Sequence, residues 1–79
     1  MIEFQLTSPP DRDLLCASLV LAWVEIAEVR YERGKFLAEI YPGPDGTPTP
    51  VSATELAEAL LAGTRMLASR LGVPDPTRR

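Results

Sequence analysis

The sequence predicts an α+β fold: an antiparallel sheet of three to four strands covered on one face by a long C-terminal helix. Residues on either side of Gly34 alternate between apolar and polar, as strand residues do. The sequence SATE at residues 52–55 is typical of a helix start, and Gly72 is typical of its end. With 79 residues the chain makes one domain, predicted over residues 1–72, followed by a flexible tail over residues 73–79.

The first element is a short strand. Residues 2–7, IEFQLT, alternate apolar and polar side chains, which predicts a strand with one buried face. Pro9 and Pro10 end it, since proline cannot donate a hydrogen bond to a sheet. The same stretch, SPPD, also has the features of a helix start, with Ser8 as the cap and proline in the first turn.

The next apolar segment therefore has two interpretations. One is a helix over about residues 9–22, and the other is a strand over residues 14–21 that pairs with residues 25–32. The strand requires a turn at residues 22–24, AWV, which has no Gly, Asn or Asp. We favour the strand because it sorts the side chains cleanly, and the helix stays open as the alternative. The strand's apolar face would hold Leu15, Ala17, Leu19 and Leu21.

The charged sequence ERGK at residues 32–35 predicts a tight hairpin. Gly34 supplies the positive φ that a two-residue loop requires. This loop sets the register: Glu32 opposite Lys35, Tyr31 opposite Phe36, Val29 opposite Ala38 and Ala27 opposite Ile40. One face is then apolar: Ala27, Val29, Tyr31, Phe36, Ala38 and Ile40. The other face carries Leu37 and the charged side chains Glu28, Arg30, Glu32, Lys35 and Glu39.

The C-terminal helix has the clearest local signals in the chain. It follows a proline-rich loop over residues 42–50. Ser52 and Glu55 form a predicted capping box, and Val51 and Leu56 form a hydrophobic staple. The predicted core stripe of this helix comprises Leu56, Leu60, Leu61, Leu67 and Leu71.

Composition restricts the classes of function. The chain has no histidine and a net charge of −3, which argues against nucleic-acid binding and against the commonest acid–base catalysis. Its single cysteine permits no internal disulfide, and we expect a cytoplasmic location. No apolar run is long enough to span a membrane, so we expect no membrane contact.

Three residues are candidate catalytic groups: Cys16, Glu28 and Glu39. Cys16 would need a basic neighbour to become a nucleophile, and Arg30 is its predicted neighbour; a packed thiol is the simpler interpretation. Glu28 and Glu39 face each other across the hairpin, but a flat strand face without a cleft is a poor place for hydrolysis. We therefore expect no enzymatic activity, no cofactor and no metal site.

The segments TSPPDR, IAEV and AEIYP, at residues 7–12, 26–29 and 38–42, resemble a group of small bacterial proteins of similar size. The resemblance covers residues 2–71 and implies a strand over residues 14–21. Ser18 and the AWV turn depart from the pattern, and no functional residue is carried over. Small folds of this kind recur among immunity proteins, antitoxins and anti-CRISPR inhibitors, a similarity of size and fold only.

Two surfaces are candidates for binding. The first is an acidic strand face that would meet a protein partner with a basic surface. It comprises Trp23, Glu25, Glu28, Arg30, Glu32 and Glu39, and Trp23 either anchors this partner or folds back onto the sheet edge. The second is a flank of small residues on the helix, away from the leucine stripe, that would pack on a second copy in a homodimer. The alternative is that these residues only favour the helix, since alanine is the best helix former. It comprises Ala59, Ala62, Gly63 and Met66.

These features favour a non-catalytic protein that binds a macromolecule and inhibits or modulates it, in the manner of immunity, antitoxin or anti-CRISPR proteins. The alternative is a small nucleic-acid-binding module, because sheet-plus-helix domains also bind RNA. Charge distinguishes the two, and the negative net charge favours the protein partner.

Overall fold

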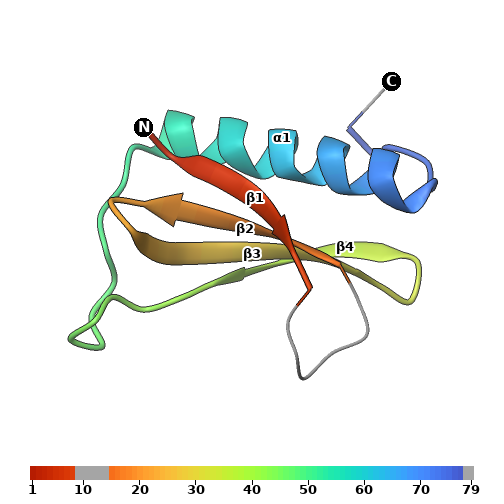
Figure 1. Ribbon diagram of the computed structural model, residues 1–79. Helices are drawn as coiled ribbons and strands as arrows, with labels where there is room; N and C mark the ends of the chain where they lie inside the picture. The colour runs from red at the N-terminus through yellow and green to blue at the C-terminus, as the bar shows by residue number, and fades with distance from the viewer. Residues whose placement is uncertain (9–14, 78–79) are drawn as a thin grey trace.

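A computed structural model describes residues 1–8 and 15–77. The element order is β1 (Glu3–Thr7), β2 (Cys16–Leu21), β3 (Val24–Glu32), β4 (Lys35–Ile40) and α1 (Ala53–Leu71). The four strands form one antiparallel sheet in the order β1-β2-β3-β4, and α1 runs along one face of it (Figure 1). The predicted α+β class is confirmed, with four strands. Most of the SPPDR connector, residues 9–12, lies outside the described residues.

Residues 16–21 are a strand, so the helix alternative for this segment is wrong. β2 pairs with β1 and β3, which places Leu19 opposite Phe4 on one side and Ala27 on the other. The turn to β3 consists of Ala22 and Trp23, with φ of 51° and 71°. Both residues adopt the left-handed conformation that two-residue hairpins require, although neither is Gly, Asn or Asp.

The β3–β4 hairpin has the predicted register. Glu32 pairs with Lys35 and Ala27 pairs with Ile40. Arg33 and Gly34 form the turn, with φ of 52° and 79°. The register matches because a two-residue loop and the alternation of side chains fix the pairing locally.

A bulge in β3 has no counterpart in the predicted pairing. Leu19 pairs with Ala27 but Val20 pairs with Glu25, so Ile26 is the extra residue on β3. Ile26 and Ala27 are consecutive and both buried, at 7% and 0% exposure. The bulge lets β3 add a second apolar side chain to the core without changing which face the rest of the strand presents.

The core lies between α1 and strands β1 to β3. Its buried residues are Ala17, Leu19, Ile26, Ala27, Val29, Ala59 and Leu67. Gly63 of α1 lies over this region: a Cβ built there would be 3.4 Å from the Ala17 Cβ. Small residues on both elements therefore allow the helix to lie close to the sheet.

This close approach corrects the predicted faces of the helix. Ala59 and Gly63 were assigned to a flank that packs on a second copy, but both are buried against the chain's own sheet. Leu61 and Leu71 were assigned to the core, but they are 44% and 39% exposed. The helix turns its small residues inward because they permit the shorter helix–sheet distance. Met66 is 40% exposed and Ala62 is half-buried.

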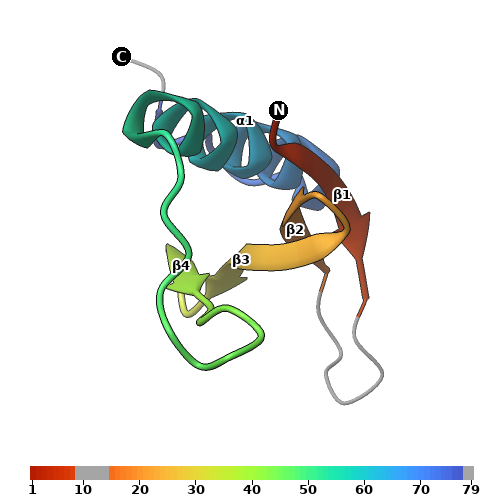
Figure 2. The ribbon, with the colours of Figure 1, turned by 90° about the vertical axis from the view of Figure 1, so that its left-hand side faces the viewer.

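Strand β4 lies outside the part of the sheet that α1 covers. Figure 2 shows it at the edge of the sheet opposite β1, and α1 packs mainly on the other three strands. Ile40 is 57% exposed and Ala38 is also exposed, although both were assigned to a covered apolar face. The prediction is wrong here because a single helix is too narrow to cover four strands spaced about 4.8 Å apart.

Both ends of α1 are capped as predicted. The Glu55 backbone N–H donates to Ser52 Oγ at 3.2 Å. Gly72 has φ 71°, and the Val73 N–H donates to the Ala68 carbonyl oxygen at 3.1 Å. Residues 76 and 77, in the predicted flexible tail, form a turn that contacts the helix: Arg65 Nε donates to Thr77 Oγ1 at 2.8 Å.

Candidate protein-binding face

The face of the sheet turned away from α1 is called the open face here. Because side chains alternate along a strand, it receives Gln5 and Thr7 from β1, Ser18 from β2 and a row of charged residues from β3 and β4. Most of the predicted partner-binding residues, including Glu25, Arg30 and Glu39, fall on this face.

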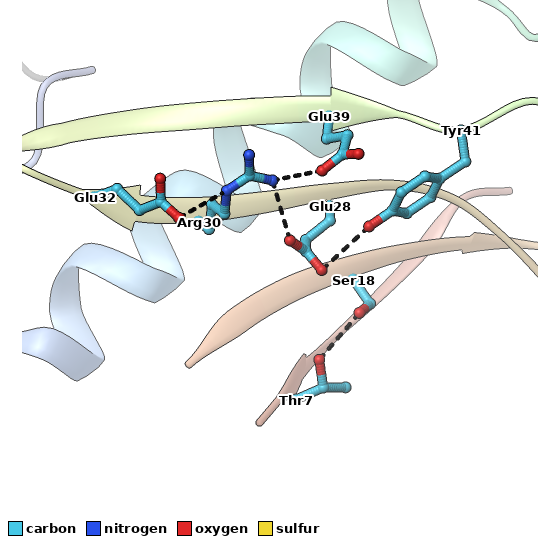
Figure 3. Close-up of polar contacts among 7 residues, drawn as sticks. All are labelled: Thr7, Ser18, Glu28, Arg30, Glu32, Glu39 and Tyr41. Carbon is cyan, nitrogen blue, oxygen red and sulfur yellow. Dashed lines mark hydrogen bonds and ion pairs between the residues drawn. The ribbon is translucent and has the colours of Figure 1, made fainter. Parts of the chain in front are cut away.

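Arg30 is the centre of the charged row (Figure 3). Its Nη1 donates to Glu39 Oε1 at 2.7 Å and to Glu28 Oε2 at 3.3 Å. Its Nε lies 3.2 Å from Glu32 Oε1, an ion-pair contact without the alignment of a hydrogen bond. The hydrogen bond that Arg30 donates to Glu39 raises the pKa of Arg30, against the lowering effect of burial. Arg30 therefore offsets the repulsion between Glu28 and Glu39, which are directly paired across β3 and β4.

The predicted place of Glu28 in the exposed binding surface is wrong. It was assigned to an exposed acidic face, yet the residue is only 4% exposed. It lies on a central strand, between Ser18 of β2 and Glu39 of β4. Tyr41 Oη donates to Glu28 Oε1 at 3.2 Å, in addition to the contact with Arg30. A carboxylate held in this way stabilises the sheet and presents little surface to a partner.

Tyr41 is a member of this network that the sequence analysis did not identify. Burial, followed by the charge of Glu28, raises the pKa of Tyr41 from 10.0 to about 12. Extending the alternation of β4 by two residues past Glu39 places Tyr41 on the open face, and that signal was available in the sequence.

Trp23 lies at the tip of the β2–β3 hairpin and is fully exposed to solvent. It is 99% exposed, so it does not fold back onto the sheet edge. Beside it the open face forms a hollow of about 490 Å³, to which Trp23, Glu25, Glu28, Gln5 and Val20 contribute. Thr7 Oγ1 and Ser18 Oγ lie 3.1 Å apart (Figure 3). Both residues also line this hollow. Glu32 and Glu39 lie farther along the sheet and do not line it.

A second hollow lies on the helix side, where the chain passes from β4 into α1. It measures about 320 Å³ and its lining is mostly apolar. Ile26, Ile40, Val51 and Leu56 contribute to it, together with residues of the loop between β4 and α1. The bulged Ile26 and the uncovered end of β4 create it, and neither feature was predicted.

The remaining candidate groups are a cysteine and the acidic side chains. Cys16 is completely buried and pairs with Arg30 across the β2–β3 ladder, as predicted. Among residues 1–8 and 15–77, no three His, Cys, Asp or Glu side chains are grouped so that they could hold a metal ion. Within the same residues, no helix is both long enough and apolar enough to cross a membrane.

Comparisons with known proteins give no match: no family model, no curated protein and no solved structure matches this chain. The resemblance to small bacterial proteins therefore stays a prediction from the residues.

Proposed function

We propose that this chain is a non-catalytic protein-binding module that inhibits or modulates its partner, in the manner of an immunity protein or antitoxin. The partner inserts a lysine or arginine side chain into the hollow between Trp23 and Glu25. The exposure of Trp23 carries the proposal.

The left-handed turn at Trp23 destabilises the protein when no partner is bound. A residue other than glycine in the left-handed region costs about 1–2 kcal/mol, and a fully exposed indole gains nothing from burial. Gly or Asn at this position would form the same turn with less strain. An unfavourable backbone conformation that presents a large aromatic group to solvent supports a binding role. Tryptophan is also among the residues most enriched at interface hot spots.

The surroundings of Trp23 favour a cationic group. The indole face attracts a guanidinium or ammonium group by a cation–π interaction of about 0.5–2 kcal/mol. Glu25 is exposed on the same hollow and supplies a negative charge. Such charges mainly increase the association rate and select the partner, so the complex should weaken with added salt. The same acidic character disfavours a nucleic-acid backbone, which is the alternative partner.

The substitution Trp23→Gly separates binding from folding. Glycine relieves the left-handed strain but has more freedom to lose on folding, so stability should rise by about 0.5–1 kcal/mol. The partner would first be captured from a lysate of the native host and identified by mass spectrometry. Calorimetry with the purified partner should then show affinity reduced at least tenfold for Trp23→Gly.

Arg33→Gly is the matched control, because Arg33 has the same left-handed backbone in the hairpin at the other end of β3. It should bind the partner like the wild type. Glu25→Lys should slow association and reduce its salt dependence. Full affinity in Trp23→Gly would refute the proposal, as would capture of nucleic acid in place of protein.

A further inference from the structure

Strand β4 is an edge whose outward backbone groups are fixed by the hairpin register. The pair next to a two-residue turn, Glu32 and Lys35, exchanges both backbone hydrogen bonds, and alternate pairs do so along the ladder. The Tyr41 N–H donates to the Ile26 carbonyl oxygen at 2.9 Å, which continues this alternation. The N–H and C=O groups of Phe36, Ala38 and Ile40 therefore point away from β3. Among the described residues, no strand lies on that side.

The side chains at this edge are also incompletely covered. Leu37 is 37% exposed on the open face, and Ile40 is 57% exposed on the helix side. α1 packs on the other three strands, so the space above β4 is not filled by the helix. The opposite edge, β1, differs because α1 packs on it.

We propose that β4 pairs antiparallel with β4 of a second copy, forming a continuous eight-stranded sheet with a two-fold axis at Leu37. The outward backbone groups restrict the register, because even-numbered residues of one copy must face even-numbered residues of the other. With the axis at Leu37, Phe36 of each copy pairs with Ala38 of its partner and both backbone hydrogen bonds form. In this pair the large Phe36 side chain lies opposite the small Ala38 side chain.

Charge complementarity selects this register over its neighbours. With the axis at Leu37, Lys35 of each copy lies opposite Glu39 of the other, and symmetry forms this favourable pair twice. Moving the axis by one residue places Lys35 opposite Leu37 or Tyr41 and removes both pairs. Glu39 is available for this contact, because its side chain is 47% exposed while it also accepts from Arg30. The axis also brings the two half-exposed Leu37 side chains together.

This interface replaces the helix flank predicted from the sequence as the dimer contact. It does not use Trp23 or Glu25, which lie at the β2–β3 end of the sheet. The dimer would therefore present two partner-binding hollows. The two helices would lie on the same side of the continuous sheet, since the two-fold axis runs perpendicular to it.

Cross-linking tests the register directly. Cysteines at a non-hydrogen-bonded antiparallel pair have Cα atoms about 4.5 Å apart, within the range of a disulfide. In a Cys16→Ala background, Leu37→Cys should form a covalent dimer on mild oxidation. Arg33→Cys is the control: Arg33 is exposed in the turn, four residues from the proposed axis, takes no part in the proposed pairs and should not cross-link to itself.

Sedimentation equilibrium measures the dimer without a cross-link. The wild type should be dimeric, and Lys35→Glu should raise the dissociation constant roughly tenfold by placing like charges opposite each other. The double variant Lys35→Glu/Glu39→Lys should recover most of that loss. A monomeric wild type at high protein concentration, or a dimer that does not cross-link through Leu37→Cys, would overturn the proposal.

Discussion

Arg30 Nη1 lies 2.7 Å from Glu39 Oε1, and this contact joins β3 to β4 on the open face of the sheet. The same nitrogen lies 3.3 Å from Glu28 Oε2. One guanidinium therefore bridges two carboxylates that the strand register places directly opposite each other. The arrangement explains how a sheet with paired glutamates remains stable.

Replacing Arg30 by methionine should lower the free energy of unfolding, because the buried Glu28 would lose its cation. Urea denaturation monitored by circular dichroism measures the change. Glu39→Gln is the control, and it should cost less than about 1 kcal/mol because the Glu39 side chain is 47% exposed. Equal losses in the two variants would show that the burial of Glu28 is energetically unimportant.

Replacing Gly63 by alanine should stabilise the protein. The added methyl group would lie 3.4 Å from the Ala17 Cβ and 3.7 Å from Leu19 Cδ1, which are ordinary contact distances. The change from glycine to alanine in a helix gains about 0.5–1 kcal/mol, so the melting temperature should rise. Gly63→Val should instead lose about 1–3 kcal/mol by overpacking the helix–sheet contact. A melting temperature that falls for both variants would mean that the space between α1 and the sheet at Gly63 cannot accept even one methyl group.

Two leucines of α1 should differ sharply when replaced by alanine. Leu67 is completely buried, so Leu67→Ala should cost about 2–5 kcal/mol. Leu61 is 44% exposed, and Leu61→Ala should change stability by less than about 1 kcal/mol. Chemical denaturation of both variants checks which face of α1 is buried. A larger loss at Leu61 would require the helix to be rotated.

The protein should lose stability in alkali because of Tyr41. Its pKa is raised to about 12 in the folded chain and returns to 10.0 on unfolding. Between these values the unfolded state has released the proton and the folded state has kept it, so stability falls as pH rises from 10 to 12. Tyr41→Phe should flatten this decline. Absorbance titration in a Tyr31→Phe background should find Tyr41 ionising near pH 12, and ionisation near 10 would contradict the partly buried hydrogen bond to Glu28.

The features predicted correctly from the sequence are local ones. A two-residue loop at Arg33 and Gly34 fixes the pairing of β3 with β4, because each successive pair follows from the turn. The caps at Ser52 and Gly72 were also correct, since they depend on residues within a few positions of each helix end. Residues 14–21 fit both a strand and a helix, because the turn that the strand needs, at Ala22 and Trp23, lacks the usual turn residues.

The sequence by itself determined the first strand and the β3–β4 hairpin, where the helix begins and ends, and which charged side chains share a face, because these depend on short spacings along the chain. The choice between strand and helix for residues 16–21 came from the tertiary structure. Only the tertiary structure decided how deeply each residue is buried. The exposure of Ile40, the burial of Glu28 and the inward position of Gly63 depend on where α1 lies across the sheet. A helix about 10 Å wide must leave part of a four-stranded sheet uncovered, and no local pattern specifies which strand that is.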